Sequence, residues 1–196
     1  MDKQYLLNES QHFCMAPWVT MHLWPNGEAM PCCVVVPDDD TPFSGKLGNI
    51  KDDSLNDLWN SKLMKQLRTN MLGDKESKTC ERCIQQEQAG NQYTLRKTLN
   101  QDFAEYFDRT QGTNKDGSHD DPKFYYWDIR FNNLCNLRCL SCSVKFSSSW
   151  YNDSVKRHEY DGPALLQLPK TFWKEALPLI GEVKHAYFAG GEPLMT

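Results

Sequence analysis

The chain has 196 residues, of which 39% are hydrophobic, and a formal net charge of −4. The length predicts one or two domains, and the acidic balance argues against a nucleic-acid-binding module, which usually carries a basic face. The start, MDKQYLLNESQHF, is too polar for a signal peptide. No apolar run approaches the ~18 residues of a membrane span. We therefore expect a soluble, cytoplasmic protein with neither a membrane nor a nucleic acid as partner.

The first half of the chain predicts a hairpin followed by helices. Apolar and polar residues alternate from residue 18, Asn26-Gly27 supplies a tight turn, and the chain returns through residues 28–33. Residues 36–49 are expected to form a loop. A leucine stripe predicts a helix over 54–72, capped by Ser54 or Asp53. A further helix starts near residue 80, and a polar helix is expected from about Tyr93 to Phe107.

The second half predicts a parallel α/β unit. Residues 108–122 are polar and rich in Gly and Asp, which is typical of a linker. A strand over 123–133 and a second strand over 184–193 enclose weak helical patterning at 147–160. A clearer helix pattern lies at 171–183, where Pro178 limits it. Strand, long crossover, helix and strand in this order favour parallel pairing of the two strands.

Cysteines carry the strongest functional signal. Five lie within residues 14–83 and three within 135–142. Without an export signal the thiols stay reduced, so clustered cysteines favour metal or cluster binding over disulfides. The eight positions are Cys14, Cys32, Cys33, Cys80, Cys83, Cys135, Cys139 and Cys142. The five histidines show no paired metal spacing and are expected to be surface or strand residues.

Three cysteines stand close together in the stretch FNNLCNLRCLSC. Cys135, Cys139 and Cys142 follow directly on a predicted buried strand, at the end where parallel barrels place active sites. A closed structural site uses four protein ligands. Three thiolates therefore suit an iron–sulfur cluster with one iron left open to another molecule.

These residues resemble a known family. The spacing of Cys135, Cys139 and Cys142 is similar to the CxxxCxxC signature of radical S-adenosylmethionine (radical SAM) enzymes. The run Gly190, Gly191, Glu192 and Pro193, at the end of the second strand, resembles that family's GGEP motif. The resemblance implies that the three thiolates hold a [4Fe–4S] cluster whose open iron chelates S-adenosylmethionine.

The same resemblance implies the chemistry. One electron would cleave S-adenosylmethionine to methionine and a 5′-deoxyadenosyl radical, which abstracts hydrogen from a substrate; the cofactor carries this chemistry and the protein positions it. Residues 190–193 would face the methionine moiety, with Glu192 near its ammonium group. Arg130 and Asn132 or Asn133 flank the cysteine loop and are candidates to contact the cluster or the cofactor.

The first-half cysteines resemble a second module. An early cysteine, the run NGEAMPCC, the phrases LGNI and SLNDLWNS and the closing CERC are similar to SPASM or twitch domains, which bind an auxiliary [4Fe–4S] cluster. The resemblance implies one closed cluster on Cys14, Cys32, Cys80 and Cys83. Of the adjacent pair, the resemblance favours Cys32, which matches the first cysteine of the family's PCC-like run; Cys33 would then be a packed thiol, since neighbours on an extended chain point to opposite sides. A tetrahedral zinc site is the alternative for the same four thiols.

The expected fold is α/β. A SPASM- or twitch-like domain (1–107) and a linker (108–122) would precede the first two βα units of an incomplete radical SAM barrel (123–196). The chain is expected to be a fragment, a truncated product or one part of a split enzyme that a second chain completes. The implied partners are S-adenosylmethionine, a one-electron donor such as a flavodoxin or ferredoxin, and a peptide or protein substrate. The alternatives are a non-catalytic iron–sulfur or zinc protein that transfers electrons or binds a partner, and an inactive remnant.

Overall fold

The computed structural model describes residues 2–35 and 45–195. Most of the loop expected at 36–49 therefore lies outside the described residues. The strands are β1 (Thr20–Leu23), β2 (Glu28–Met30), β3 (Gly48–Asn49), β4 (Tyr126–Ile129) and β5 (His185–Phe188). The α-helices are α1 (Ala16–Val19), α2 (Leu55–Trp59), α3 (Lys62–Leu72), α4 (Glu81–Gln88), α5 (Leu95–Asp102), α6 (Tyr151–Lys156) and α7 (Lys170–Ala176). A π-helix, η1 (Tyr5–Glu9), and the 3₁₀ segments η2 (Lys78–Cys80), η3 (Ala104–Gly112), η4 (Ser148–Trp150), η5 (Leu177–Glu182) and η6 (Pro193–Met195) complete the set.

One sheet of five strands, in the order β3-β2-β1-β4-β5, unites the two halves of the chain. β1 and β2 form the predicted antiparallel hairpin, and β4 and β5 pair in parallel, as predicted. β1 also pairs in parallel with β4, with Thr20 opposite Tyr126 and Leu23 opposite Ile129. The hairpin and the second-half strands, expected in two domains, thus share a single sheet.

The hairpin turn follows the expected chemistry. Gly27 has φ +89°, and its N–H donates to the Trp24 carbonyl oxygen at 2.9 Å. A left-handed φ of this kind favours glycine. The first strand is shorter than the alternation suggested, because Trp18 and Val19 belong to α1, in which Pro17 occupies the first turn.

The helix expected over 54–72 is two helices. Ser54 caps α2 through a capping box with Asp57, and the Ser61 side chain caps α3 by accepting from the Met64 N–H. Because a second serine cap lies seven residues after the first, α2 ends at Trp59 and a new helix begins after Ser61. The leucine stripe is buried as predicted; Leu55, Leu58 and Leu67 are each at most 4% exposed.

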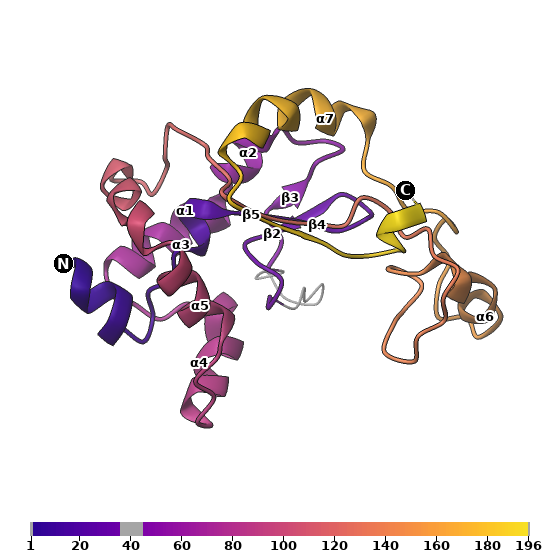
Figure 1. Cartoon of the computed structure of the whole chain (residues 1–196), viewed down its shortest axis with the longest axis horizontal. Helices are drawn as coiled ribbons and strands as arrows, with labels where there is room; N and C mark the ends of the chain where they lie inside the picture. Colours follow the sequence, from indigo (N-terminus) through magenta and orange to yellow (C-terminus); the bar gives the residue numbers. More distant parts are fainter. Residues whose placement is uncertain (1, 36–44, 196) are drawn as a thin grey trace.

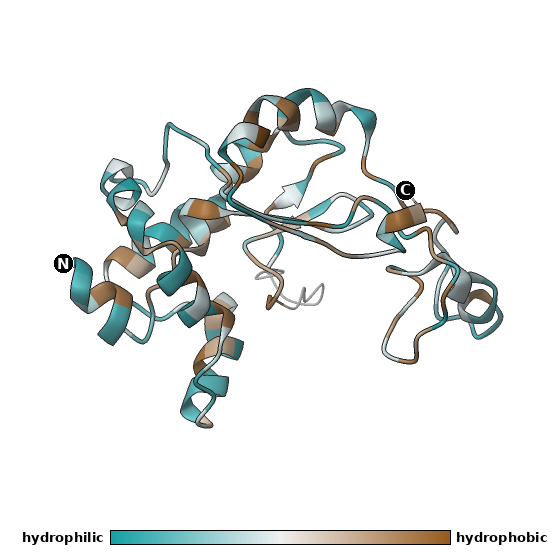
Figure 2. Ribbon diagram, viewed as in Figure 1, coloured by the Kyte–Doolittle hydropathy of each residue, from teal (hydrophilic) through white to brown (hydrophobic). Residues whose placement is uncertain are grey.

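α2 and α7 cover one face of the sheet (Figure 1). Trp127 and Ile129 of β4 pack with Phe172 and Ala176 of α7 in one core cluster. The Leu55 N–H also donates to Oε2 of Glu175 at 2.7 Å, so α2 and α7 are joined across the two halves. A second core cluster gathers α1, α3 and α5 around Phe13 and Trp18. In Figure 2, α4 is largely hydrophilic. The residues that this helix buries are Cys83 and Ile84.

The segment expected as a linker is ordered against the helices. The Trp59 indole N–H donates to the His119 carbonyl oxygen at 3.0 Å, and His119 is 4% exposed. A bridge joins Thr113 and His119, and Arg109 pairs with Asp121. None of the helices in the described residues is long and apolar enough to cross a membrane.

Candidate iron–sulfur centres

Four cysteines of the first half line one pocket. Cys14 precedes α1, Cys32 follows β2, Cys80 lies in η2, and Cys83 lies in the first turn of α4. The rest of the lining is mainly apolar and includes Val34, Val35, Leu67, Met71 and Leu95. The hairpin, the α3 helix and the start of α4 therefore bring together thiols that are up to 69 positions apart in the sequence.

Burial keeps these thiols protonated when nothing is bound. Burial, with smaller contributions from nearby Cys32 and Cys83, raises the pKa of Cys80 to about 12. Burial also raises the pKa of Cys14 and of Cys32, with smaller effects from neighbouring thiols. Four thiolates in an apolar pocket would be strongly unfavourable without a cationic partner. A metal ion or an iron–sulfur cluster is such a partner, so the donor set fits one.

The described residues contain no group of three or more His, Cys, Asp or Glu side chains already converged on one metal position. The suitability of the pocket for a metal ion or a cluster consequently rests on the four thiols that line it.

Arg96 forms the polar wall of this pocket. Its guanidinium donates from Nε to Oε1 of Glu87 at 2.9 Å and makes a closer contact with Oε2 through Nη2. Nη1 donates to the carbonyl oxygens of Ser10 and Phe13 at 2.9 and 3.0 Å. This cation lowers the pKa of Cys14, although burial outweighs it. Arg96 thus anchors the chain before Cys14 to α4 and α5.

The adjacent cysteines 32 and 33 face different surroundings. Cys32 lines the four-thiol pocket, whereas Cys33 is exposed and lies outside it. Burial of part of the Cys33 thiol and the neighbouring Asp128 carboxylate raise its pKa to about 11. The structure therefore places the favoured cysteine, Cys32, with the other three.

The three-thiol loop lies at the carboxyl end of β4. Cys139 is exposed, and Cys135 and Cys142 are partly exposed. Burial raises the pKa of Cys142, and Cys135 and Cys139 raise it by smaller amounts. Within the loop, the Cys142 N–H donates to the Cys139 carbonyl oxygen at 3.0 Å. In Figure 1 this loop, α6 and the last described residues gather at one end of the sheet, away from α4 and α5.

Polar side chains fix the base of this loop. Asn133, 0% exposed, donates to the carbonyl oxygens of Val144 and Ala164 and accepts from the Leu166 N–H. The hydroxyls of Ser148 and Ser149 donate to the Cys135 carbonyl oxygen at 3.3 and 2.6 Å. The side-chain amide of Asn133 therefore bonds to the backbone of the segments around the cysteine loop.

The Gly190–Pro193 run docks directly on the cysteine loop. The Gly191 N–H donates to the Phe146 carbonyl oxygen, and the Glu192 N–H donates to that of Leu134, both at 2.7 Å. Gly190 and Gly191 have φ +75° and +64°. A Cβ on Gly190 would lie 2.8 Å from Cβ of Arg130, and one on Gly191 would lie 2.5 Å from the Leu134 oxygen. Both glycines are thus required for the turn to close on β4 and its loop. Pro193 starts η6, and Oε1 of Glu192 accepts from the Leu194 N–H at 3.2 Å.

A buried polar cluster joins the hairpin to β4. His22 and Asp128 are directly opposite in the β1–β4 register, and His22 Nδ1 lies 3.1 Å from Asp128 Oδ2. Asp128 Oδ1 accepts from Arg130 Nη1 at 2.8 Å. Burial raises the pKa of Asp128, but His22 and Arg130 outweigh it, so the pKa is below its ordinary value. His22 is a strand residue, as expected of the histidines, but it is buried; in the sequence, neither it nor Asp128 carries a signal beyond its place on a predicted strand.

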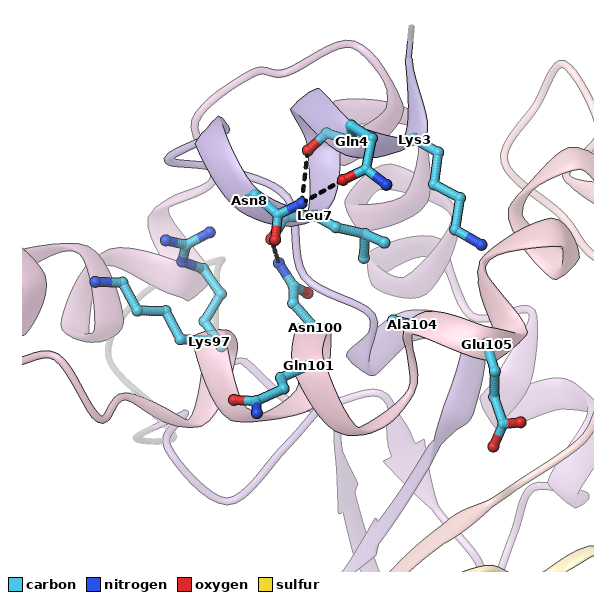
Figure 3. Close-up of a pocket in the computed structure, with 10 residues that line it drawn as sticks. Lys3, Gln4, Leu7, Asn8, Lys97, Asn100, Gln101, Ala104 and Glu105 are labelled. Carbon is cyan, nitrogen blue, oxygen red and sulfur yellow. Dashed lines mark hydrogen bonds between the residues drawn. The ribbon is translucent and has the colours of Figure 1, made fainter.

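Another pocket lies between η1 and α5 (Figure 3). Lys3, Gln4 and Asn8 face Lys97 and Gln101 across it, and the Asn8 amide donates to Oε1 of Gln4 at 2.9 Å. None of the sequence-predicted cysteines or glycines lines this pocket.

Comparison with known proteins supports the first-half site. Residues 14–84 match the family model of SPASM, described as an iron–sulfur cluster-binding domain. The match begins at one predicted ligand, Cys14, and ends one residue after another, Cys83. SPASM domains occur in radical SAM enzymes. No curated protein and no solved structure matches the chain.

Proposed function

We propose that the chain is a radical SAM protein, or part of one, that holds two [4Fe–4S] clusters. Cys14, Cys32, Cys80 and Cys83 would hold the auxiliary cluster, and Cys135, Cys139 and Cys142 the other. A cluster on the three-thiol loop would supply one electron for reductive cleavage of S-adenosylmethionine.

One observation carries this proposal: the docking of the Gly190–Pro193 run on the cysteine loop. The backbone bonds from Gly191 to Phe146 and from Glu192 to Leu134 place the run against both ends of the loop. Both segments follow parallel strands of the same sheet, and ligands of such sheets bind outside the carboxyl ends of the strands. The three cysteines of the loop leave one iron of a cluster without a protein ligand.

The chain's own residues would bind and orient the cofactor. The Gly191–Glu192 backbone forms one wall of the site, and the Glu192 carboxylate would pair with the cofactor's ammonium group. We further propose a flavodoxin- or ferredoxin-type electron donor and a peptide or protein substrate. A second chain that completes the sheet would pair at β5, where Tyr187 and Phe188 are 54% and 49% exposed.

Electron paramagnetic resonance of the anaerobically reconstituted, reduced chain tests the proposal. Addition of S-adenosylmethionine should change the spectrum of one cluster only. The change should disappear when Cys135, Cys139 and Cys142 are all replaced by Ala, and persist in Cys33→Ala. A reduced spectrum that S-adenosylmethionine leaves unaltered would favour the alternative of a non-catalytic iron–sulfur or zinc protein.

A further inference from the structure

The hairpin of the first half adds a third parallel strand beside β4, and its end lies next to the glycine turn. The residues that follow β1, β4 and β5 are Trp24, Arg130 and the Gly190–Gly191 turn. The Trp24 ring meets the Phe146 ring edge-on, with centroids 5.1 Å apart. The Arg130 guanidinium lies 5.7 Å from the same Phe146 ring. Trp24, Arg130 and the cysteine loop thus lie together at the carboxyl edge of the sheet, where ligands of parallel sheets bind.

Two nitrogens of the Arg130 guanidinium, Nε and Nη2, are available as hydrogen-bond donors at this edge of the sheet. Its Nη1 donates to Asp128 Oδ1 at 2.8 Å, and its aliphatic stem packs against Gly190. Within residues 2–35 and 45–195, its Nε and Nη2 make no hydrogen bond, and neither is among the fully buried unpartnered atoms. The side chain is 14% exposed. A guanidinium with one edge tied and the other open is suited to bind a carboxylate.

The open edge of Arg130 is held in place by the hairpin. The Trp24 indole N–H donates to His22 Nε2 at 3.1 Å, so the neutral His22 ring carries its proton on Nδ1. That nitrogen lies 3.1 Å from Asp128 Oδ2 and 3.2 Å from Arg130 Nη1, and Asp128 Oδ1 accepts from the same Arg130 nitrogen. Since His22 and Asp128 are both 1% exposed at the side chain, neither can turn away. The order of contacts is Trp24, His22, Asp128, Arg130 and then Gly190.

We propose that Arg130 binds the methionyl carboxylate of S-adenosylmethionine, and that Asp128 and His22 are positioning residues that orient it. This inference rests on the proposed function, because it assigns a contact within the same cofactor site. It also gives the SPASM-matching segment a direct part in that site, through His22 and Trp24 of the hairpin.

The test compares two ligands that differ only in the carboxylate. Dissociation constants for S-adenosylmethionine and for decarboxylated S-adenosylmethionine are measured by anaerobic equilibrium dialysis on the reconstituted full chain. In Arg130→Gln, affinity for S-adenosylmethionine should fall about ten- to a hundredfold, the range for a hydrogen bond to a charged group. Affinity for the decarboxylated ligand should stay unchanged. Asp128→Asn should give a smaller loss with the same selectivity, and Arg130→Lys should restore part of it.

Arg157→Gln is the matched control, because it removes an exposed arginine at the end of α6 whose ion pair, among the described residues, is with Glu159. It should leave both dissociation constants unchanged, and iron content confirms that each variant keeps its clusters. An equal loss for both ligands in Arg130→Gln, or no loss for either, would overturn the assignment of Arg130 while leaving the proposed function intact. A wild-type chain that binds neither ligand would overturn both.

Discussion

His22 Nδ1 lies 3.1 Å from Asp128 Oδ2, and this contact joins two segments separated by more than a hundred residues. It lies in the parallel pairing of β1 with β4, where the two residues are direct partners. Because both side chains are buried, the contact links the hairpin of the four-thiol segment to the strand that carries the three-thiol loop. The two candidate centres are therefore built on one sheet.

Removal of His22 should destabilise the whole fold. His22→Ala removes one partner of the buried Asp128 carboxylate, and it takes away the acceptor of the Trp24 indole N–H. Because His22 is neutral in the folded chain, the loss is that of buried hydrogen-bonding partners, about 1–3 kcal/mol, and the free energy of unfolding should drop by about 2 kcal/mol in urea titrations. His158→Asn is the control, because His158 is exposed and has φ +57°, which Asn tolerates. A His22→Ala variant as stable as this control would contradict the buried pair.

The same pair predicts a pH dependence of stability. Burial lowers the pKa of His22 below its usual 6.5, and the Asp128 contact only partly offsets this. As the pH falls through about 6.5, the unfolded chain therefore binds a proton at His22, whereas the folded chain does not. The stability from His22 is complete above that pH and is lost as the pH falls below it. Asp128, whose pKa is lowered from 3.8, adds a second loss below about pH 4.

Urea unfolding of the wild type and of His22→Gln, measured from pH 8 to pH 5, isolates the His22 contribution. The decline of the wild type between pH 7 and pH 5 should be clearly steeper than that of the variant. Parallel curves would show that His22 is charged in the folded chain, against its burial.

The adjacent cysteines should differ in iron binding. Cys32→Ala should remove the iron of the first-half cluster, about four iron atoms per chain, because Cys32 lines the pocket with the other three thiols. Cys33→Ala should retain all of the iron, since Cys33 is directed to Asp128 instead. Iron assays on the two variants, reconstituted side by side, check this. The reverse result would exchange the roles of the two residues.

The Ser54 cap offers a local test of helix α2. Ser54→Ala removes the capping box of α2 and should cost about 1 kcal/mol of unfolding free energy. Ser77→Ala is the matched control, because Ser77 precedes η2 without a side-chain capping bond. Thermal unfolding followed by circular dichroism measures both. Equal midpoints for the two variants would show that α2 does not depend on its cap.

Local patterns predicted much of the fold but not the way the two halves meet. The Asn26-Gly27 turn, the hairpin and the parallel pair of β4 and β5 are confirmed, because each depends on short-range chemistry or on a common connection. The pairing of β1 with β4 depends on side-chain packing across more than a hundred residues, which periodicity does not contain. The break at Asn60 was also missed, since the leucine spacing continues through it while Ser61 starts a new helix.

The candidate thiols can be named from cysteine spacing in the sequence, whereas the polar residues that support them cannot. Cysteine spacing is a chemical signal that survives without a structure, and residues 14–84 match an iron–sulfur cluster-binding domain. His22 and Asp128 gave no such signal, because a buried histidine and a surface histidine look alike in an alternating strand. The family resemblance assigns Gly190 and Gly191 to a ligand contact, and the structure adds a second reason for glycine: a Cβ at these positions would collide with Arg130 and with the Leu134 oxygen.

Metal content tests the central claim most directly. The chain is purified without oxygen, reconstituted with iron and sulfide, and assayed for iron, sulfide and zinc, alongside the triple variant of Cys135, Cys139 and Cys142 to Ala. Two clusters predict about eight iron atoms and as many sulfides in the wild type, and about four of each in the variant. A chain that keeps zinc alone, with no stable iron, would contradict the account and leave a structural metal protein.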